Sequence, residues 1–171
     1  LESLAGTLPT VTLIEAVDLR DPEAAAKVIA STTTRFGAID LVVNVAGATK
    51  RGDFLELTDA DWADGYALKF FGAMRLCRAA WPHLVASRGS IVNISGVGGR
   101  TGSADFSIGG SVNAAVLNLT KALADRGVRD GVRVNAINPG SILTERLRTR
   151  VETLAAEERI DFTTAETKMA E

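Results

Sequence analysis

A lysine inside an apolar stretch is the first residue whose type and setting indicate chemistry. Lys69 is flanked by Leu68, Phe70 and Phe71 in a stretch that reads as a helix, so we expect this helix to be mostly buried. Lysines that tolerate burial have lowered pKa values, which suit them to act as acids or bases. The alternative is an ordinary solvated helix lysine.

Three serine hydroxyls lie near the positions where such chemistry is expected. Ser95 ends a predicted strand, whereas Ser107 and Ser111 lie in a glycine-rich stretch at the start of a helix. Serines in such turns are usually local caps, so Ser95 is the first choice for a donor that orients a substrate. The single tyrosine, Tyr66, is expected to be a packing residue.

The composition limits the class of protein. The chain has 171 residues, 46% of them hydrophobic and 23% charged, with a net charge of −2. This indicates one soluble globular domain and gives no reason to expect nucleic acid as a partner. The single cysteine, Cys77, excludes an internal disulfide and a cysteine-built metal site, and it favours a cytoplasmic setting. We expect no metal and no membrane span, and His83 is interpreted as a helix-end residue.

The elements that must position these residues alternate between strand and helix. Apolar, β-branched runs predict strands at 10–17, 38–47, 89–95 and 131–138. Helices are predicted from the Asp21 cap and Pro22 to Gly37, from the Thr58 cap to His83, over 105–127, and from near Thr144. The alternation predicts an α/β protein with a doubly wound parallel sheet between two helical layers.

Ligands of such sheets bind beyond the carboxyl ends of the strands. Four segments with small or turn-forming residues lie there, at 18–19, 44–47, 94–99 and 138–144. Each allows a backbone to approach a ligand closely.

The same segments resemble the short-chain dehydrogenase/reductase family. "DLVVNVAG" is similar to its Asn-Asn-Ala-Gly segment, "IVNISGVGG" to its serine-bearing strand end, and "RVNAINPGSILT" to its Pro-Gly-x-x-x-Thr loop. "DWADGYALKFFGAMRLCRAAWPH" resembles its long fourth helix. The resemblance implies a Rossmann-type fold, a nicotinamide dinucleotide, and hydride transfer to or from an alcohol or carbonyl substrate.

The resemblance also implies a set of cofactor contacts. Asp18 matches the acid that binds the adenine amino group, and Leu19 and Ile94 lie at the same sheet edge. The remaining contacts implied are Asn44, Ala46, Gly47, Pro139, Gly140, Ile142 and Thr144. Each has a structural alternative, such as a strand end for Asp18, a turn for Pro139 or a helix cap for Thr144. The sequence does not distinguish NAD from NADP.

The family's glycine-rich turn, its first two strands and its last strand have no counterpart in this sequence. We therefore expect a single Rossmann-type domain over 1–171 that is an internal segment of a longer protein. In the usual strand order, the strand at 10–17 would then lack a neighbour for its backbone groups.

The family's reactive residues are a serine, a Tyr-x-x-x-Lys pair and an asparagine on the fourth helix. In this sequence Gly96 lies at the serine position, directly after Ser95, and Gly109 lies at the tyrosine position. Asn113 takes the lysine position and Lys69 the asparagine position. Because the lysine and the asparagine have exchanged places, the pattern favours a rearranged site over a decayed one.

A divergent branch of the family has this arrangement, with an aromatic residue, often tyrosine, seven residues before the asparagine. Here that residue is Phe106, which has no hydroxyl. The first hypothesis is an oxidoreductase in which Lys69 stabilises or protonates the alkoxide and Asn113 holds the nicotinamide ribose. The rival is an inactive binding or scaffold protein.

Two helices carry apolar residues on more than one face. These residues include Phe70, Phe71, Trp81 and Val116. A helix that is apolar nearly all round must be covered on both sides, and the family pairs through these helices. A homodimer or homotetramer is therefore expected.

Overall fold

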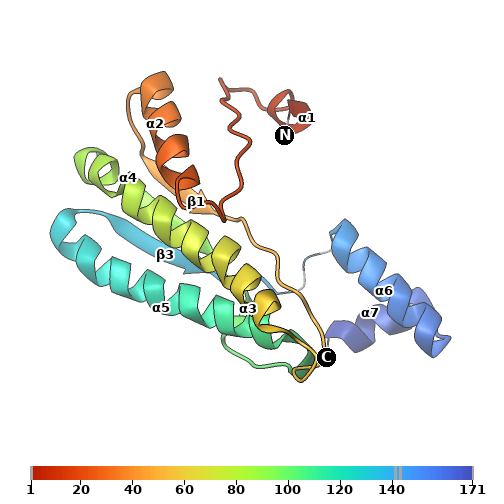
Figure 1. Ribbon diagram of the computed structural model, residues 1–171. Helices are drawn as coiled ribbons and strands as arrows, with labels where there is room; N and C mark the ends of the chain where they lie inside the picture. Colours follow the sequence, from red (N-terminus) through yellow and green to blue (C-terminus); the bar gives the residue numbers. More distant parts are fainter. Residues whose placement is uncertain (1, 141, 143, 171) are drawn as a thin grey trace. The chain divides into compact units, whose positions relative to one another are not determined.

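The computed structural model describes residues 2–140, 142 and 144–170, and the chain divides into two compact units. The first unit extends to Asn138 and contains the sheet, whereas the second begins at Pro139. Each unit is described by itself (Figure 1).

Three parallel strands form the sheet of the first unit, in the order β1-β2-β3. β1 is Leu41–Asn44, β2 is Ser90–Ile94 and β3 is Arg133–Ile137. Asn44 pairs with Asn93, which in turn pairs with Ala136 of β3. The parallel sheet confirms the predicted α/β class.

Helices connect the strands. α2 (Ala24–Phe36) precedes β1, whereas α3 (Asp59–Tyr66), the π-helical segment η1 (Ala67–Gly72) and α4 (Ala73–Ser87) join β1 to β2. α5 (Ser107–Asp130) follows the 3₁₀ turns η2 (Val97–Gly99) and η3 (Ala104–Phe106), and a short α1 (Glu2–Ala5) begins the described chain. α4 and α5 run side by side (Figure 1).

Helix ends follow the sequence signals in most places. Thr58 and Asp61 form the predicted capping box of α3, and α2 ends at Gly37, whose φ of 81° suits glycine. The predicted start of α2 at Asp21 is wrong. The Asp21 carboxylate accepts from the Glu23 backbone N–H at 3.0 Å in a turn, and the helix begins at Ala24.

The core lies between the sheet and the helices. Alternating strand residues such as Ile91 and Val134 are buried, whereas Leu41 and Ile137 on the opposite face are 55% and 54% exposed. The described helices of the first unit thus cover one face, and the second predicted layer is not seen in this unit. The core cluster is Ile29, Ile39, Cys77, Ala80, Leu84, Ile91, Val132 and Val134.

The predicted strand at 10–17 is not formed. Residues 11–18 carry no regular secondary structure, and the side chains of Val11, Leu13 and Ile14 are exposed. A strand exists through hydrogen bonds to a neighbouring strand, and none pairs with this segment in the described part of the chain. Its β-branched composition therefore gives an extended segment without a sheet.

The second unit is a pair of helices, α6 (Glu145–Glu158) and α7 (Phe162–Ala170). The Thr144 hydroxyl accepts from the Leu147 backbone N–H at 3.4 Å, so Thr144 is the helix cap. Lys168 pairs with Glu158 between the two helices. Among the described residues, no helix is long and apolar enough to cross a membrane.

Candidate functional site

Lys69 lies in the π-helical segment η1, and π-turns are frequent at functional sites. Its Nζ donates to the backbone carbonyl of Ser95 at 2.7 Å. Burial lowers the pKa of the Lys69 amine from its ordinary value. No described carboxylate lies within ion-pair distance of Nζ, so two of its three N–H donors are free to meet a ligand.

Gly47, just beyond the end of β1, supports the lysine side chain. A Cβ at this position would lie 2.8 Å from the Lys69 Cδ, well inside the usual carbon–carbon contact of about 3.5–4.0 Å. The absence of a side chain at Gly47 therefore gives the Lys69 stem its path toward Ser95.

Ser95 is a positioning residue in this geometry. Its hydroxyl, on a side chain in a residue only 5% exposed, donates to the backbone carbonyl of Asn113 at 2.9 Å. Its own carbonyl holds Lys69. The hydroxyl thus joins β2 to α5, and the role of Ser95 as a substrate-orienting donor stays a prediction.

Asn113 lies in the same cluster, on α5. The residue is 4% exposed, and its Oδ1 has no hydrogen-bond partner among the described residues. Its Nδ2 lies against Gly96, where an added Cβ would approach to 3.0 Å. Gly96 has a φ of 148°, a conformation that side chains rarely adopt. A serine at Gly96 would therefore be disfavoured twice, by its close approach to the Asn113 side chain and by the backbone conformation.

Phe106 fills the space beside Gly109. A Cβ on Gly109 would lie 2.1 Å from Cε2 and Cζ of the Phe106 ring, and one on Gly98 would lie 3.0 Å from its Cε1. The ring thus occupies the place where a side chain at the family's tyrosine position would begin. The sequence drew attention to the aromatic residue Phe106, but it did not predict that the Phe106 ring would fill the space beside Gly109.

Arg51 is a residue that the sequence reasoning missed. Its guanidinium lies 3.9 Å from the centre of the Phe106 ring and pairs with Asp105 at 2.6 Å. The Gly52 N–H donates to the Asp105 carbonyl at 3.1 Å. Hydrogen bonds from Ser103 and Arg51 hold the pKa of Asp105 below its ordinary value. Only the three-dimensional approach of two distant loops makes this contact.

A buried polar chain lies behind the site. The Asn44 Nδ2 donates to the Asn93 Oδ1 at 2.8 Å and to the Cys77 Sγ at 3.3 Å, and the Asn93 Nδ2 donates to the Thr120 hydroxyl at 2.8 Å. Burial raises the pKa of the Cys77 thiol to about 11, so it stays protonated. Asn93 was not predicted, although an amide within the apolar run "IVNIS" was a usable signal.

The other predicted cofactor residues are dispersed. Asp18 accepts from the Arg20 backbone N–H at 3.0 Å, and Leu19 lies against Gly72. Ala46 is exposed, and Ile94 ends β2. The second unit holds Pro139, Gly140, Ile142 and Thr144, and their cofactor role stays a prediction.

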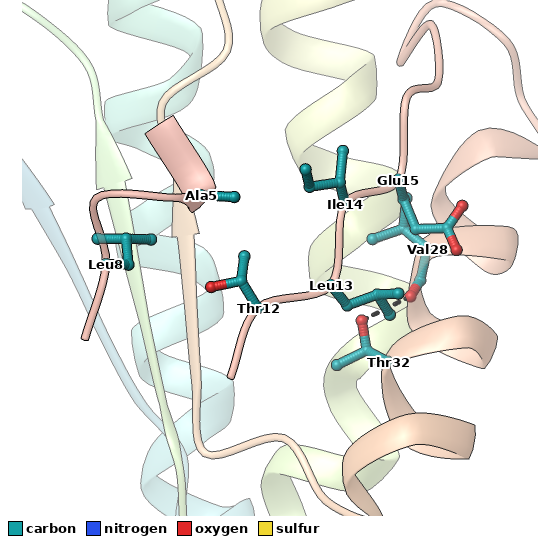
Figure 2. A pocket seen from close by; sticks show the side chains of 8 residues that line it. All are labelled: Ala5, Leu8, Thr12, Leu13, Ile14, Glu15, Val28 and Thr32. Atoms are coloured by element: carbon teal, nitrogen blue, oxygen red, sulfur yellow. Dashed lines mark hydrogen bonds between the residues drawn. The ribbon is translucent and has the colours of Figure 1, made fainter. Parts of the chain in front are cut away.

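A hollow of about 300 Å³ lies between α2 and the extended segment before it (Figure 2). None of the predicted site residues lines it. Its walls are mostly apolar, and the Thr32 hydroxyl is engaged with the Val28 carbonyl at 2.7 Å. We therefore do not place the chemistry there. The lining residues are Ala5, Leu8, Thr12, Leu13, Ile14, Glu15, Val28 and Thr32. The described side chains also include no cluster of three or more residues suited to hold a metal.

A parallel α/β sheet with polar groups gathered at the carboxyl ends of its strands defines a Rossmann-type protein. Residues 1–168 match the protein family described as Enoyl-(Acyl carrier protein) reductase. L-fucose dehydrogenase of Oryctolagus cuniculus is 40% identical over 128 residues, which make up 74% of this chain and 45% of that protein. The chain belongs to the short-chain dehydrogenase/reductase family.

Solved structures of similar proteins support the same family and fold. A short-chain dehydrogenase from Streptomyces avermitilis matches with a TM-score of 0.79 and 34% identity, over 85% of this chain and 54% of that one. L-sorbose reductase from Gluconobacter frateurii, complexed with NADPH and L-sorbose, matches with a TM-score of 0.86 and 29% identity, over 95% of this chain and 62% of that one. The chain spans about half the length of the curated relatives that it matches.

Proposed function

We propose that this chain carries the reaction centre of a nicotinamide-dependent oxidoreductase that interconverts an alcohol and a carbonyl compound. Lys69 takes the part of the proton donor and acceptor. The relatives named above include a sugar dehydrogenase and a sugar reductase, which supports a small polyhydroxylated substrate.

The observation that carries the proposal concerns the two glycines that lie at reactive positions of the family, Gly96 and Gly109, because a neighbouring side chain fills the space at each. Phe106 fills the space beside Gly109. Asn113 lies against Gly96, which takes a backbone conformation suited to glycine. Random loss of catalytic residues leaves cavities, whereas here the freed spaces are occupied. The centre is therefore rearranged and closely packed.

Proton transfer follows from the position of the lysine. In reduction, a hydride reaches the carbonyl carbon and the π electron pair moves to the oxygen. The Lys69 ammonium then gives a proton to that oxygen, forming the alcohol and a neutral amine. In oxidation, the neutral amine removes the hydroxyl proton as the hydride leaves. A lowered pKa suits both directions, because each protonation state is then accessible nearer neutral pH.

The residues present fit a dinucleotide. The unpartnered Oδ1 of Asn113 needs a hydrogen-bond donor, and a ribose hydroxyl is such a donor. The exposed carboxylate of Asp18 suits an adenine amino group, and Asn44, Ala46 and Gly47 lie at and just beyond the carboxyl end of β1. NAD or NADP, when bound, supplies or accepts the hydride.

Assembly into a homodimer or homotetramer is part of the proposal. Phe71 and Val85 are 40% and 39% exposed, which supports a covering partner. Val116 is 2% exposed and lies in the core, so it belongs to the face of its helix that packs against the sheet unit. Trp81 donates to Asp130 at 2.7 Å and links α4 to α5. Light scattering at micromolar concentration should give at least a dimer, and a monomer contradicts this part. The cytoplasmic setting also stays a prediction.

The experiment compares full-length wild type with Lys69→Met. Fluorescence titration measures binding of NADPH and NADH, and turnover is followed on a panel of sugars, polyols and other carbonyl compounds. We expect both proteins to bind cofactor and Lys69→Met to lose about 10²–10⁴-fold in kcat. Equal turnover by the two proteins contradicts the role of Lys69. Dinucleotide binding without turnover by wild type favours the rival, an inactive binding protein.

A further inference from the structure

The charge around Lys69 is unbalanced. The amine is half-buried, and among the described residues it donates to a neutral carbonyl, that of Ser95, at 2.7 Å. Within the described residues no acidic side chain pairs with it. A cation removed from water in this way gains from an opposite charge or a strong acceptor nearby.

The segment after β1 carries a second cation, Arg51, away from Lys69 along the neighbouring helix. Gly47 lies against Lys69, Thr49 lies against Gly65, and the Lys50 amine pairs with Asp61 at 3.0 Å. The segment thus follows α3 and η1 backward, one helical turn per contact. An extended chain advances about 3.6 Å per residue at most. Four residues separate Arg51 from Gly47, so the Arg51 backbone lies within about 14 Å of the Gly47 backbone.

The Arg51 side chain has two partners, Phe106 and Asp105. Its guanidinium stacks over Phe106 and gives one N–H to Asp105. Phe106 in turn lies against Gly98, which borders the Asn113 side chain. A guanidinium has five N–H donors, and the 32% exposure of this side chain leaves room for a ligand at its remaining edge.

The start of α5 lies directly after Phe106, beside the Arg51–Asp105 pair. The helix begins at Ser107 with no side-chain cap, so the partial positive charge of its amino end is not neutralised by a capping carboxylate. Asp105 is the carboxylate that contacts Arg51, and its charge is shared with the Ser103 hydroxyl.

We propose that Arg51 binds a carboxylate of the substrate, so that the protein acts on a hydroxy or oxo acid rather than on a neutral alcohol. The reacting hydroxyl or carbonyl group lies at Lys69, and the carboxylate lies at the opposite end of the molecule, on the Arg51 edge that Asp105 leaves open. This assignment names the substrate class of the oxidoreductase reaction proposed above and rests on that proposal. Binding of the carboxylate can be measured without turnover.

The experiment uses a panel of hexuronates and aldonates, each beside its neutral sugar or polyol. Binding to the full-length protein is measured by thermal shift and calorimetry, without reference to turnover. We expect at least one acid to bind more tightly than its neutral counterpart, by about 10- to 100-fold. That preference should disappear in Arg51→Met and be partly restored in Arg51→Lys.

Two matched variants separate carboxylate binding from support of the loop. Asp105→Asn breaks the Arg51 pair yet keeps the guanidinium, so binding of the acid should be unchanged or tighter. Arg78→Met removes an exposed arginine of α4 and should change nothing. If Arg51→Met and Asp105→Asn weaken acid and neutral ligands equally, Arg51 supports the loop only.

The two proposals fail in different ways. A panel in which no acid exceeds its neutral counterpart, or a preference that persists in Arg51→Met, overturns the carboxylate assignment whatever the turnover. A preference for acids that depends on Arg51, in a protein that turns over no substrate, upholds the assignment and contradicts the oxidoreductase function.

Discussion

Replacement of Gly109 by alanine tests whether Phe106 truly occupies the space of a side chain. Inside a helix, alanine is favoured over glycine by about 0.8–1.0 kcal/mol. A Cβ at Gly109 would lie 2.1 Å from two ring carbons, whereas normal contacts need about 3.5 Å or more. The ring must therefore move by over 1 Å, and overpacking of this kind costs about 1–3 kcal/mol.

We expect Gly109→Ala to lower the free energy of unfolding by about 1 kcal/mol in the full-length protein. In a Phe106→Ala background the same change should raise it by up to about 1 kcal/mol, which gives a coupling of about 2 kcal/mol. Urea denaturation of the four proteins of the cycle measures this. Ala122→Gly, at an exposed position of the same helix, supplies the alanine preference of α5. Stabilisation by Gly109→Ala in both backgrounds refutes the placement of the ring.

Three further outcomes follow from the same geometry. Gly96→Ser, which forces a side chain into a φ of 148° beside Asn113, should lower stability by about 1–3 kcal/mol without raising activity, and a stable or more active variant contradicts this. Asn93→Ala should cost about 1–3 kcal/mol for each buried partner left unpaired, and a loss no larger than that of the exposed control Asn118→Ala speaks against the buried chain. Burial lowers the pKa of Lys69 below 10.5, so the unfolded state binds more protons between the two pKa values, and stability should rise with pH through that window. Lys69→Met should remove this rise, and an identical slope in both proteins counts against it.

The sequence predicted the parallel strands and most helix ends, because those features depend on local patterns. The capping box at Thr58 and the left-handed glycine at Gly37 are both confirmed. The strand at 10–17 failed for a non-local reason, since no strand among the described residues pairs with its β-branched segment. Periodicity alone also does not reveal that η1 is π-helical.

The candidate site was predicted in part. Alignment drew attention to Lys69 and Asn113, and the structure brings both to Ser95. The engagement of the Ser95 hydroxyl depends on a contact between residues 18 positions apart, which a pattern of residue types does not contain. The stacking of Arg51 on Phe106 joins two loops and is likewise visible only after folding.

The pH dependence of kcat tests the role of Lys69 most directly. Carbonyl reduction needs the ammonium, so kcat of the full-length wild type should fall as pH rises through the lowered pKa of Lys69. Alcohol oxidation needs the neutral amine and should rise over the same range. We expect Lys69→Met to lose both pH-dependent changes and about 10²–10⁴-fold in kcat. An unchanged pH dependence and an unchanged kcat in that variant contradict the role of Lys69.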